Sequence, residues 1–238
     1  MTKLYSQLAR VYHEMYQSVF NYKKEFQLYN KLLKKYKCKK ILELGCGSGN
    51  LASFFLKAGY NYTGLDLFKE MIKIAKKAEP KAKFVQGDMR NISLKGRFDA
   101  ILITGRSFTY LTTNDDIMNA LESIHKTLKK NGTLIFDNFN AEAIFKDFKK
   151  PIVQYASFKG TRYKRITKKK INLKTGWAWD LDETYYINKN GKTKIIKDTD
   201  TLRAFTLDEL KLFLKLNNFE VLRNSKQDFA ILTFAKKK

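Results

Sequence analysis

The glycine-rich segment Glu43-Leu44-Gly45-Cys46-Gly47-Ser48-Gly49-Asn50 carries the residues with the clearest chemical use. It follows a short apolar run, Ile41 to Leu44, and precedes a helical pattern from Asn50 to Ala58. A strand that passes through glycines into a helix ends at the edge where α/β sheets bind ligands. Glycine there lets the backbone turn sharply and approach a ligand closely. The segment therefore predicts a ligand-binding hinge.

The glycines alone leave the ligand open. Gly47 to Ala52 also fits the G-x-G-x-x-A pattern of proteins that bind nicotinamide dinucleotides. However, Glu43 ends the strand just before Gly45, and its carboxylate would repel a pyrophosphate. A cofactor without phosphate that carries an amino group and a sulfonium would be attracted instead.

Two further carboxylates follow the next two predicted strands. Asp66 ends a strand candidate from Asn61 to Asp66, where an acid can accept hydrogen bonds from both hydroxyls of a ribose. Asp88 follows a strand candidate from Lys83 to Gln86, and there it could accept the amino proton of an adenine. Each acid alone is equally explained as a strand-end charge or a turn residue. Three acids at the ends of three successive strands predict a nucleoside site.

The elements that must position these acids alternate between strand and helix. Residues 3 to 37 are predicted to be helical, and later helices are expected at 68–77 and 113–129. Further strands are expected at 98–103 and 133–137. This alternation predicts a doubly wound α/β sheet with parallel pairing.

After about residue 150 the alternation stops. Four β-rich stretches follow, separated by turn signals such as Asn190-Gly191, which is typical of a two-residue hairpin. A last helix begins near Leu207, and the chain closes with strands at 219–223 and 229–234. We therefore expect N-terminal helices and a core over 1–150, an antiparallel β flap over 151–203, and a return to the core over 204–238.

These motifs together resemble those of class I S-adenosylmethionine-dependent methyltransferases. Residues 41–49 resemble the first motif of that family, Gly64-Leu65-Asp66 the second and Gln86-Gly87-Asp88-Met89-Arg90 the third. The resemblance covers residues 39–138 and implies a seven-stranded, mostly parallel sheet of order 3-2-1-4-5-7-6. It also implies that S-adenosylmethionine is the cofactor. The cofactor-binding residues that it implies are Tyr12, Tyr22, Glu43, Gly45, Cys46, Gly47, Asp66, Leu67, Met71, Asp88, Met89, Arg90 and Thr104.

A closer similarity is to bacterial small-molecule N-methyltransferases that act on nucleotide-linked amino sugars or on glycine and sarcosine. It is carried by Gly87 to Arg90, Gly96 to Ala100, Ser107 to Leu111 and an N-terminal Val11-Tyr12-His13-Glu14-Met15-Tyr16. His13 stands where these relatives usually have Asp. Helix packing is an equal explanation for Tyr12 and Tyr22.

The predicted acceptor residues follow the fourth strand and lie in the flap. Arg106 could hold a carboxylate or phosphate through two hydrogen bonds, or form a surface ion pair. Ser107 is assigned to the acceptor with it, and Tyr110 could relay a proton or pack in the core. Trp177 and Trp179 should share one face of a flap strand, where they either wall the acceptor pocket or pack the flap on the core.

Composition bears on partners and compartment. The net charge is +24, with 39 Lys and 8 Arg spread along the chain. Such a charge favours either a solvated surface or the alternative of an RNA or protein methyltransferase. Cys38 and Cys46 suggest no disulfide framework, the two histidines suggest no metal site, and no apolar run is of membrane-spanning length.

We therefore expect a cytoplasmic enzyme, a monomer or homodimer, that methylates a small-molecule acceptor and has no metal or membrane partner. Two other classes stay open. One is an S-adenosylmethionine-binding regulatory or scaffold protein, and the other is a nicotinamide-dependent oxidoreductase.

Overall fold

A computed structural model describes residues 2–146, 148 and 150–238. Met1, at which the first predicted segment begins, lies outside the described residues, as do Asp147 and Lys149 near the predicted boundary at 150. The helices are α1 (Ala9–Val19), α2 (Tyr22–Lys35), α3 (Ala52–Lys57), α4 (Lys69–Ala78), α5 (Asn114–Thr127), α6 (Ala141–Lys146) and α7 (Leu207–Leu216), with 3₁₀ turns η1 (Ser107–Tyr110) and η2 (Leu173–Thr175).

The main sheet has seven strands in the order β10-β11-β5-β4-β1-β2-β3. Only β11 runs antiparallel to its neighbours. In chain order within this sheet, the arrangement is the predicted 3-2-1-4-5-7-6, so the expected fold class is confirmed. The strands are β1 (Lys40–Leu44), β2 (Asn61–Asp66), β3 (Lys83–Gln86), β4 (Phe98–Ile103), β5 (Leu128–Phe139), β10 (Phe219–Gln227) and β11 (Ala230–Lys237).

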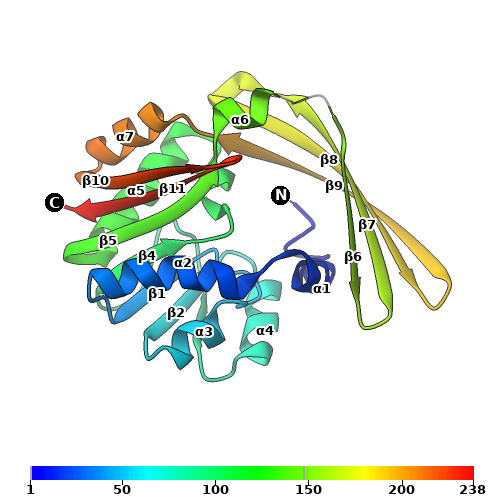
Figure 1. Cartoon of the computed structure of the whole chain (residues 1–238), viewed down its shortest axis with the longest axis horizontal. Coiled ribbons are helices and arrows are strands. Elements are labelled where there is room, and N and C mark those ends of the chain that lie inside the picture. Colours follow the sequence, from blue (N-terminus) through cyan, green and yellow to red (C-terminus); the bar gives the residue numbers. More distant parts are fainter. Residues whose placement is uncertain (1, 147, 149) are drawn as a thin grey trace.

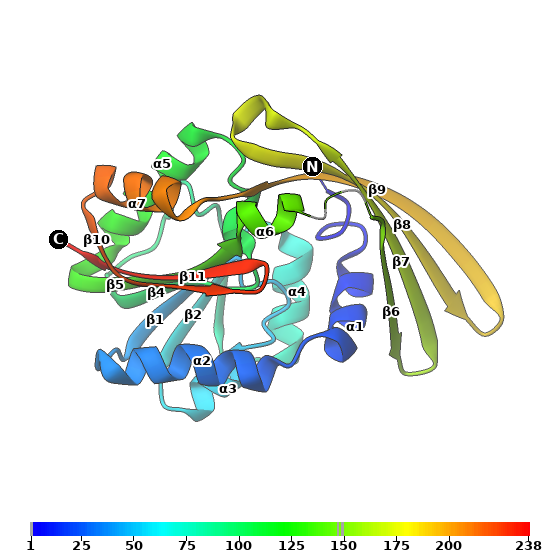
Figure 2. The same cartoon turned by 45° about the horizontal axis from the view of Figure 1, so that its top comes forward.

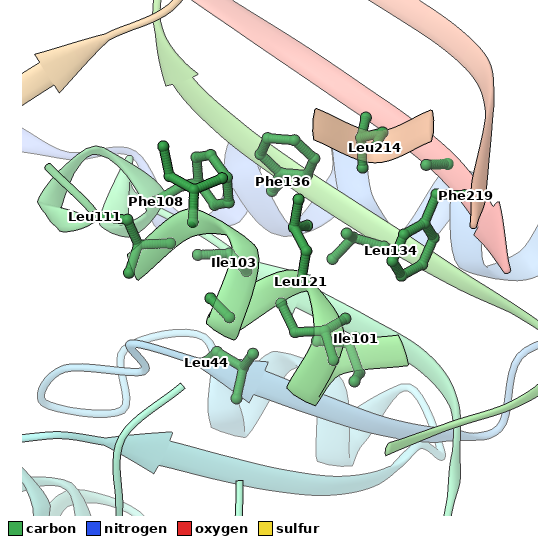
Figure 3. Close-up of a cluster of buried hydrophobic side chains, with 14 of the residues drawn as sticks. Leu44, Ile101, Ile103, Phe108, Leu111, Leu121, Leu134, Phe136, Leu214 and Phe219 are labelled. Carbon is green, nitrogen blue, oxygen red and sulfur yellow. The ribbon is translucent and has the colours of Figure 1, made fainter. Parts of the chain in front are cut away.

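Each face of this sheet is covered by its own helices (Figures 1 and 2). On one face, α5 and α7 pack a continuous apolar cluster in which Leu121 and Leu214 meet Ile101, Leu134 and Phe136 of the central strands, as Figure 3 shows. On the other face, α2 and α3 bury a second cluster. Burial on both faces explains why the central strands are nearly continuous apolar runs.

The region 3–37, predicted to be helical, contains two helices, and the prediction does not hold for residues 3–8 or for the break between the helices. Residues 3–8 form turns, and the chain breaks between α1 and α2 at Phe20 and Asn21. Asn21 starts α2 by accepting a hydrogen bond from the backbone N–H of Lys24, a typical N-cap. The break lets α1 leave the face of the sheet and pack against the flap.

The flap is a separate four-stranded antiparallel sheet of order β6-β7-β8-β9. Its strands are β6 (Ile152–Phe158), β7 (Thr161–Ile171), β8 (Trp177–Lys189) and β9 (Lys192–Ala204). It stands away from the core on one side, with α1 and the N-terminal segment in between (Figures 1 and 2). The space between the two sheets is thus occupied by the start of the chain. Among the described residues, no helix is both long and apolar enough to cross a membrane.

A capping box starts helix α7, where the chain returns from the flap to the core. Thr206 accepts from the backbone N–H of Glu209, and the Glu209 carboxylate accepts from the backbone N–H of Thr206, so α7 begins with both groups satisfied. At α5 only half of such a box forms. Thr113 accepts from the N–H of Asp116, but the Asp116 carboxylate binds Arg90 instead.

We predict that Thr206→Ala lowers the free energy of unfolding by about 1 kcal/mol, because one N–H at the start of α7 loses its acceptor. Urea denaturation followed by circular dichroism measures the change. Thr199→Ala, an exposed flap position, is the matched control. An equal loss in both variants would contradict the capping role.

Candidate functional site

The hinge between β1 and α3 needs glycine at two positions. Gly45 has φ +68°, and a Cβ there would lie 2.6 Å from the side chain of Ser107. Gly49 has φ +76°, and a Cβ there would lie 2.8 Å from the ring of Phe84. Any larger residue would combine a left-handed backbone with a steric clash. The hinge is therefore fixed in shape by its neighbours, as a ligand cradle requires.

Glu43 lies at the end of β1, directly beneath this hinge. Its side chain is buried, with one carboxylate oxygen accepting from the Thr104 hydroxyl at 2.6 Å and the other from the Tyr62 hydroxyl at 2.5 Å. Burial raises the pKa of Glu43 to about 7, although the two hydroxyls act in the opposite direction. No cation is paired with it among the described residues.

Asp66 shares the face of the sheet on which Glu43 lies. It is buried at the end of β2 and accepts from the backbone N–H of Gly47 at 2.8 Å and of Phe68 at 2.9 Å. Burial raises the pKa of Asp66, and its charge in turn helps to raise that of Glu43. The two predicted carboxylates therefore do converge on the glycine hinge.

Asp88 does not join this pair. Its carboxylate accepts from the Arg90 guanidinium at 2.6 Å, and Arg90 also binds Asp116 at 2.7 Å. The Arg90 hydrogen bonds keep the pKa of Asp88 below its usual range despite partial burial. The third predicted acid is thus an ion-paired turn residue at the edge of the sheet. Met89, between the two, packs partly against the core.

The N-terminal helices are tied to the hinge by polar contacts that the sequence did not reveal. His13 lies 2.9 Å from the Ser48 hydroxyl. Asn50 donates to the Tyr22 hydroxyl at 2.8 Å. The Tyr12 ring lies over Gly47, where an added Cβ would be 3.9 Å from its Cε1. Tyr12 and Tyr22 are therefore placed at the hinge as expected, and Ser48 and Asn50 join them.

Tyr5 is a further residue at the site that sequence reasoning missed. Its ring lies 5.1 Å from that of Tyr12 and 5.6 Å from that of Phe68, and its hydroxyl is 2.6 Å from the Tyr110 hydroxyl. It thus joins the end of β2 to the end of β4 across the hinge. Tyr5 sits in a segment with no regular secondary structure, so no periodic signal marks it.

Thr104, Arg106 and Ser107 follow β4. Ser107 donates to the backbone oxygen of Thr104 at 2.9 Å and packs against Gly45, so it shapes the hinge. Arg106 has φ +63°, and its backbone N–H donates to Asp137 at 3.0 Å. Its guanidinium lies 4.9 Å from the ring of Phe229, and its buried Nε has no partner. Among residues 2–146, 148 and 150–238, Arg106 forms none of the ion pairs, so the surface ion pair considered as the alternative is not seen there.

Glu25 and Asp137 form an acidic pair beside Arg106 that the sequence did not suggest. Burial raises the pKa of Glu25 to about 7, and the nearby charges of Asp137 and Glu43 add to the effect. Asp137 is buried and accepts from the Tyr29 hydroxyl at 3.3 Å. The site side of the sheet thus collects carboxylates from β1, β2, β5 and α2.

The other predicted residues take mainly packing positions. Trp177 and Trp179 share one face as expected, and both contact the ring of Phe145 on α6. Trp179 is buried in a cluster with Leu202, so this tryptophan joins the flap to the core. Met71 and Cys46 are buried, whereas Leu67 is 41% exposed.

Trp179 and Phe145 belong to the apolar cluster that also includes Tyr110, between the flap and the end of β4. A groove of about 600 Å³ lies elsewhere, at the α1–α2 junction, and reaches Asn50, Ser53 and Phe54. Tyr22, which lines this groove, has its pKa raised by burial and partly by the charges of Glu25 and Glu43. The groove therefore adjoins the acidic face that carries Glu43 and Asp66.

Residues 41–132 match the protein family described as "Methyltransferase domain". This part of the chain is therefore similar to a methyltransferase domain. The match spans the strands from β1 to β4 and helix α5, and it contains Glu43, Asp66 and Arg106. The resemblance seen in the sequence motifs is thereby confirmed at the level of the domain.

Two curated relatives and one solved structure are examples of the proteins to which this chain is similar. A glycine/sarcosine N-methyltransferase of Aphanothece halophytica is 29% identical over 126 residues, 50% of this chain and 48% of that protein. A dTDP-3-amino-3,4,6-trideoxy-alpha-D-glucopyranose N,N-dimethyltransferase of Streptomyces venezuelae is 31% identical over 97 residues, 41% of each chain. The chain spans about half the length of the curated relatives it matches.

The crystal structure of an S-adenosylmethionine-dependent methyltransferase from Clostridium acetobutylicum ATCC 824 superposes with a TM-score of 0.81. It is 18% identical and covers 98% of both chains, so the likeness extends over the flap as well as residues 41–132. The complete architecture, including the inserted antiparallel sheet, is thus shared with that structure.

We predict that the buried Glu43 makes stability depend on pH. Its raised pKa means that the folded chain binds this proton more tightly than the unfolded chain. The stability from its neutral form is therefore complete below its ordinary pKa and is lost as pH rises through about 7. Glu43→Gln should flatten the decline in unfolding free energy between pH 5 and 8 by up to about 3 kcal/mol.

Urea denaturation at a series of pH values measures this effect. Glu220→Gln, an exposed position on β10, is the matched control and should keep the slope of the wild type. An unchanged slope in Glu43→Gln would show that the carboxylate is ionised and compensated in the folded chain.

Proposed function

We propose that this protein transfers a methyl group from S-adenosylmethionine to a nitrogen of a small-molecule acceptor by in-line displacement. The observation that carries the proposal is the pair of buried carboxylates, Glu43 and Asp66, on one face of a rigid glycine hinge. A phosphate would be repelled there, whereas a nucleoside with an amino group and a sulfonium would be attracted. The bound cofactor supplies an activated methyl group.

The residues present fit this cofactor. Each oxygen of Asp66 accepts one backbone N–H, and a carboxylate oxygen can accept a second bond, so ribose hydroxyls can be held without losing the existing contacts. Glu43, in the same way, can accept from an amino group while Tyr62 and Thr104 hold it. Gly45 and Gly47 leave the backbone open to close approach, and Tyr12 covers the hinge.

Asp88 is proposed at the adenine end with a reduced role. Its carboxylate is already bound by Arg90, so Arg90 fixes its direction and an adenine amino group would be a second donor to it. The adjoining Met89 and the exposed Leu67 are proposed to flank the base, and Met71 and Cys46 to support the hinge from below.

The acceptor is proposed to bind between η1 and the flap. Both curated relatives described above are named as N-methyltransferases, and this favours an amine. Arg106 has a buried nitrogen without a partner and is proposed to hold an anionic group of the acceptor. Tyr110 is proposed to face the reacting nitrogen. Because methyl transfer needs alignment more than acid–base catalysis, the chain mainly orients the reactants and excludes water.

The cellular compartment and the oligomeric state are part of the same proposal. Cys38 and Cys46 are free and buried, which suits a reducing compartment, and we place the enzyme in the cytoplasm as a monomer or homodimer. Trp177 and Trp179 are assigned to attaching the flap, with any contact to the acceptor secondary to that packing.

Isothermal calorimetry with S-adenosylmethionine and S-adenosylhomocysteine tests the cofactor half of the proposal. We predict that Asp66→Ala weakens both affinities at least tenfold, because the ribose hydroxyls lose a charged acceptor. Asp182→Ala, an exposed acid on the flap, should bind as the wild type does. Absence of binding by folded wild-type protein would end the proposal.

The alternative of an RNA or protein methyltransferase draws on the net charge of +24 and on the lysines of the flap, such as Lys164, Lys168 and Lys170. The acids gathered at the hinge and Arg106 favour a small acceptor over a polyanion. We predict weak RNA binding at 150 mM salt in a filter-binding titration. Tight binding that falls steeply with salt would favour the alternative.

A further inference from the structure

The inner face of the flap, which is turned toward α1 and η1, carries a defined set of charged residues. In the antiparallel register, Leu181 of β8 lies opposite Asp200 of β9, and Glu183 lies opposite Asp198. Directly opposite residues share a face, as do residues two apart. Asp198, Asp200, Leu181 and Glu183 therefore all lie on the same side, and Tyr185 of that side packs against α1.

Four of the charged side chains on this face have partners, namely Glu183, Arg165, Asp198 and Lys169. Glu183 accepts from Thr167 at 3.0 Å and Tyr185 at 2.5 Å and lies 3.4 Å from Arg165. Asp198 accepts from the start of the chain, from the Thr2 hydroxyl and from backbone N–H groups. These contacts fix the flap and the N-terminal segment, so they leave no role for either acid in binding a ligand. Lys169 on β7 lies over the ring of Phe148.

Asp200 differs from these acids. The one hydrogen bond that the described residues give its carboxylate is from the adjacent backbone N–H of Thr201, at 2.9 Å, and it comes to Oδ1. Its Oδ2 has no donor in this part of the chain. Burial raises the pKa of Asp200 to about 7, the charges of Asp198 and Glu183 act in the same direction, and the positive charge of the N-terminus acts in the opposite direction. A carboxyl group with that pKa can hold or release a proton at neutral pH.

Asp200 also lies beside the residue at which the acceptor is proposed to react. Tyr110 packs in the cluster formed by Trp179, Leu181 and Leu202, of which Leu181 is opposite Asp200 and Leu202 is two residues beyond it. The Asp200 charge is the largest influence after burial in raising the pKa of Tyr110. The carboxylate and the phenol therefore share the space between η1 and β9.

We propose that Asp200 binds the acceptor amine in its ammonium form beside Tyr110 and accepts the proton that this amine must lose before it reacts. This inference rests on the proposed function and names its substrate class: a primary or secondary amine that is protonated in water. The proton moves from nitrogen to Asp200 Oδ2, which frees the nitrogen lone pair. The lone pair then forms the N–CH₃ bond as the CH₃–S bond breaks, and its electron pair stays on sulfur. The proton on Asp200 passes to solvent.

Sinefungin tests this placement without knowledge of the acceptor. It carries a protonated primary amine where S-adenosylmethionine carries its transferable methyl, whereas S-adenosylhomocysteine has no group there. We predict that Asp200→Asn weakens sinefungin about tenfold, the loss expected for one charge-assisted hydrogen bond, and changes the affinity for S-adenosylhomocysteine less than twofold. Asp182→Asn, on the opposite face of the flap, is the matched control and should change neither.

Each result decides between the two proposals. If wild-type protein binds neither ligand, the proposed function fails and this inference fails with it. If S-adenosylhomocysteine binds but Asp200→Asn and a second variant, Asp200→Ser, keep the wild-type preference for sinefungin, the role of Asp200 alone is overturned. The same holds if both variants lose both ligands equally, because Asp200 would then support the whole site and not the amine.

Discussion

The buried carboxylate of Glu43 is the constraint on which the rest of the site depends. An ionised group costs several kcal/mol to bury unless its surroundings compensate it. Here the compensation comes from two neutral hydroxyls, Tyr62 on β2 and Thr104 after β4, and no cation is in contact among the described residues. The hydroxyls hold the side chain in one direction, and because its pKa is raised to about 7, Glu43 can release its proton when a cationic group binds beside it. A salt bridge within the chain would have occupied the Glu43 carboxylate and prevented it from binding a cationic group.

The parallel sheet determines which acids can act together. Glu43, Asp66 and Asp137 end neighbouring or nearby strands on the face that α2 covers, because alternation along each strand sends every second side chain to that face. Asp88 follows β3 at the edge of the sheet, where a turn takes over and Arg90 can reach it. The unpaired acids of this face thus come from the inner strands of the sheet. At the edge strand β3, the acid is neutralised by Arg90.

This geometry explains what could be predicted from the sequence. The strand order and the flap followed from the period of apolar residues, from turn signals and from family motifs, all of which are local. Glu43 and Asp66 were found because each lies at the end of a strand that the sequence pattern predicts. Tyr5, Glu25, Asp137 and Asp200 carry no such signal. Their importance comes from contacts with residues far along the chain, such as Tyr5 with Tyr110 and Tyr29 with Asp137.

The break between α1 and α2 has a related cause. Apolar spacing covers both halves of the N-terminal region, but the two halves bury their apolar faces against different partners. The first half packs on Tyr163 and Tyr185 of the flap, and the second packs on Ile41 of the main sheet. Asn21 supplies a cap exactly where the direction must change, and so the local sequence permits the break that tertiary packing requires.

The flap and the core are joined by the start of the chain as well as by α6. Asp198 accepts hydrogen bonds from Thr2, Lys3 and Leu4, and Tyr5 then reaches Tyr110. A displacement of the flap would therefore shift the N-terminal segment that covers the hinge. Conversely, a shift of this segment on binding at the hinge would be transmitted to β9. The charge near Tyr110 differs from that of the rest of the chain. Lysines are abundant along the chain, whereas the polar residues that face Tyr110 from β9 are acidic. Among the described residues, Asp200 has no hydrogen-bond donor for its Oδ2 beside Tyr110, and this local acidity within a basic chain agrees with the proposal that the acceptor is an amine.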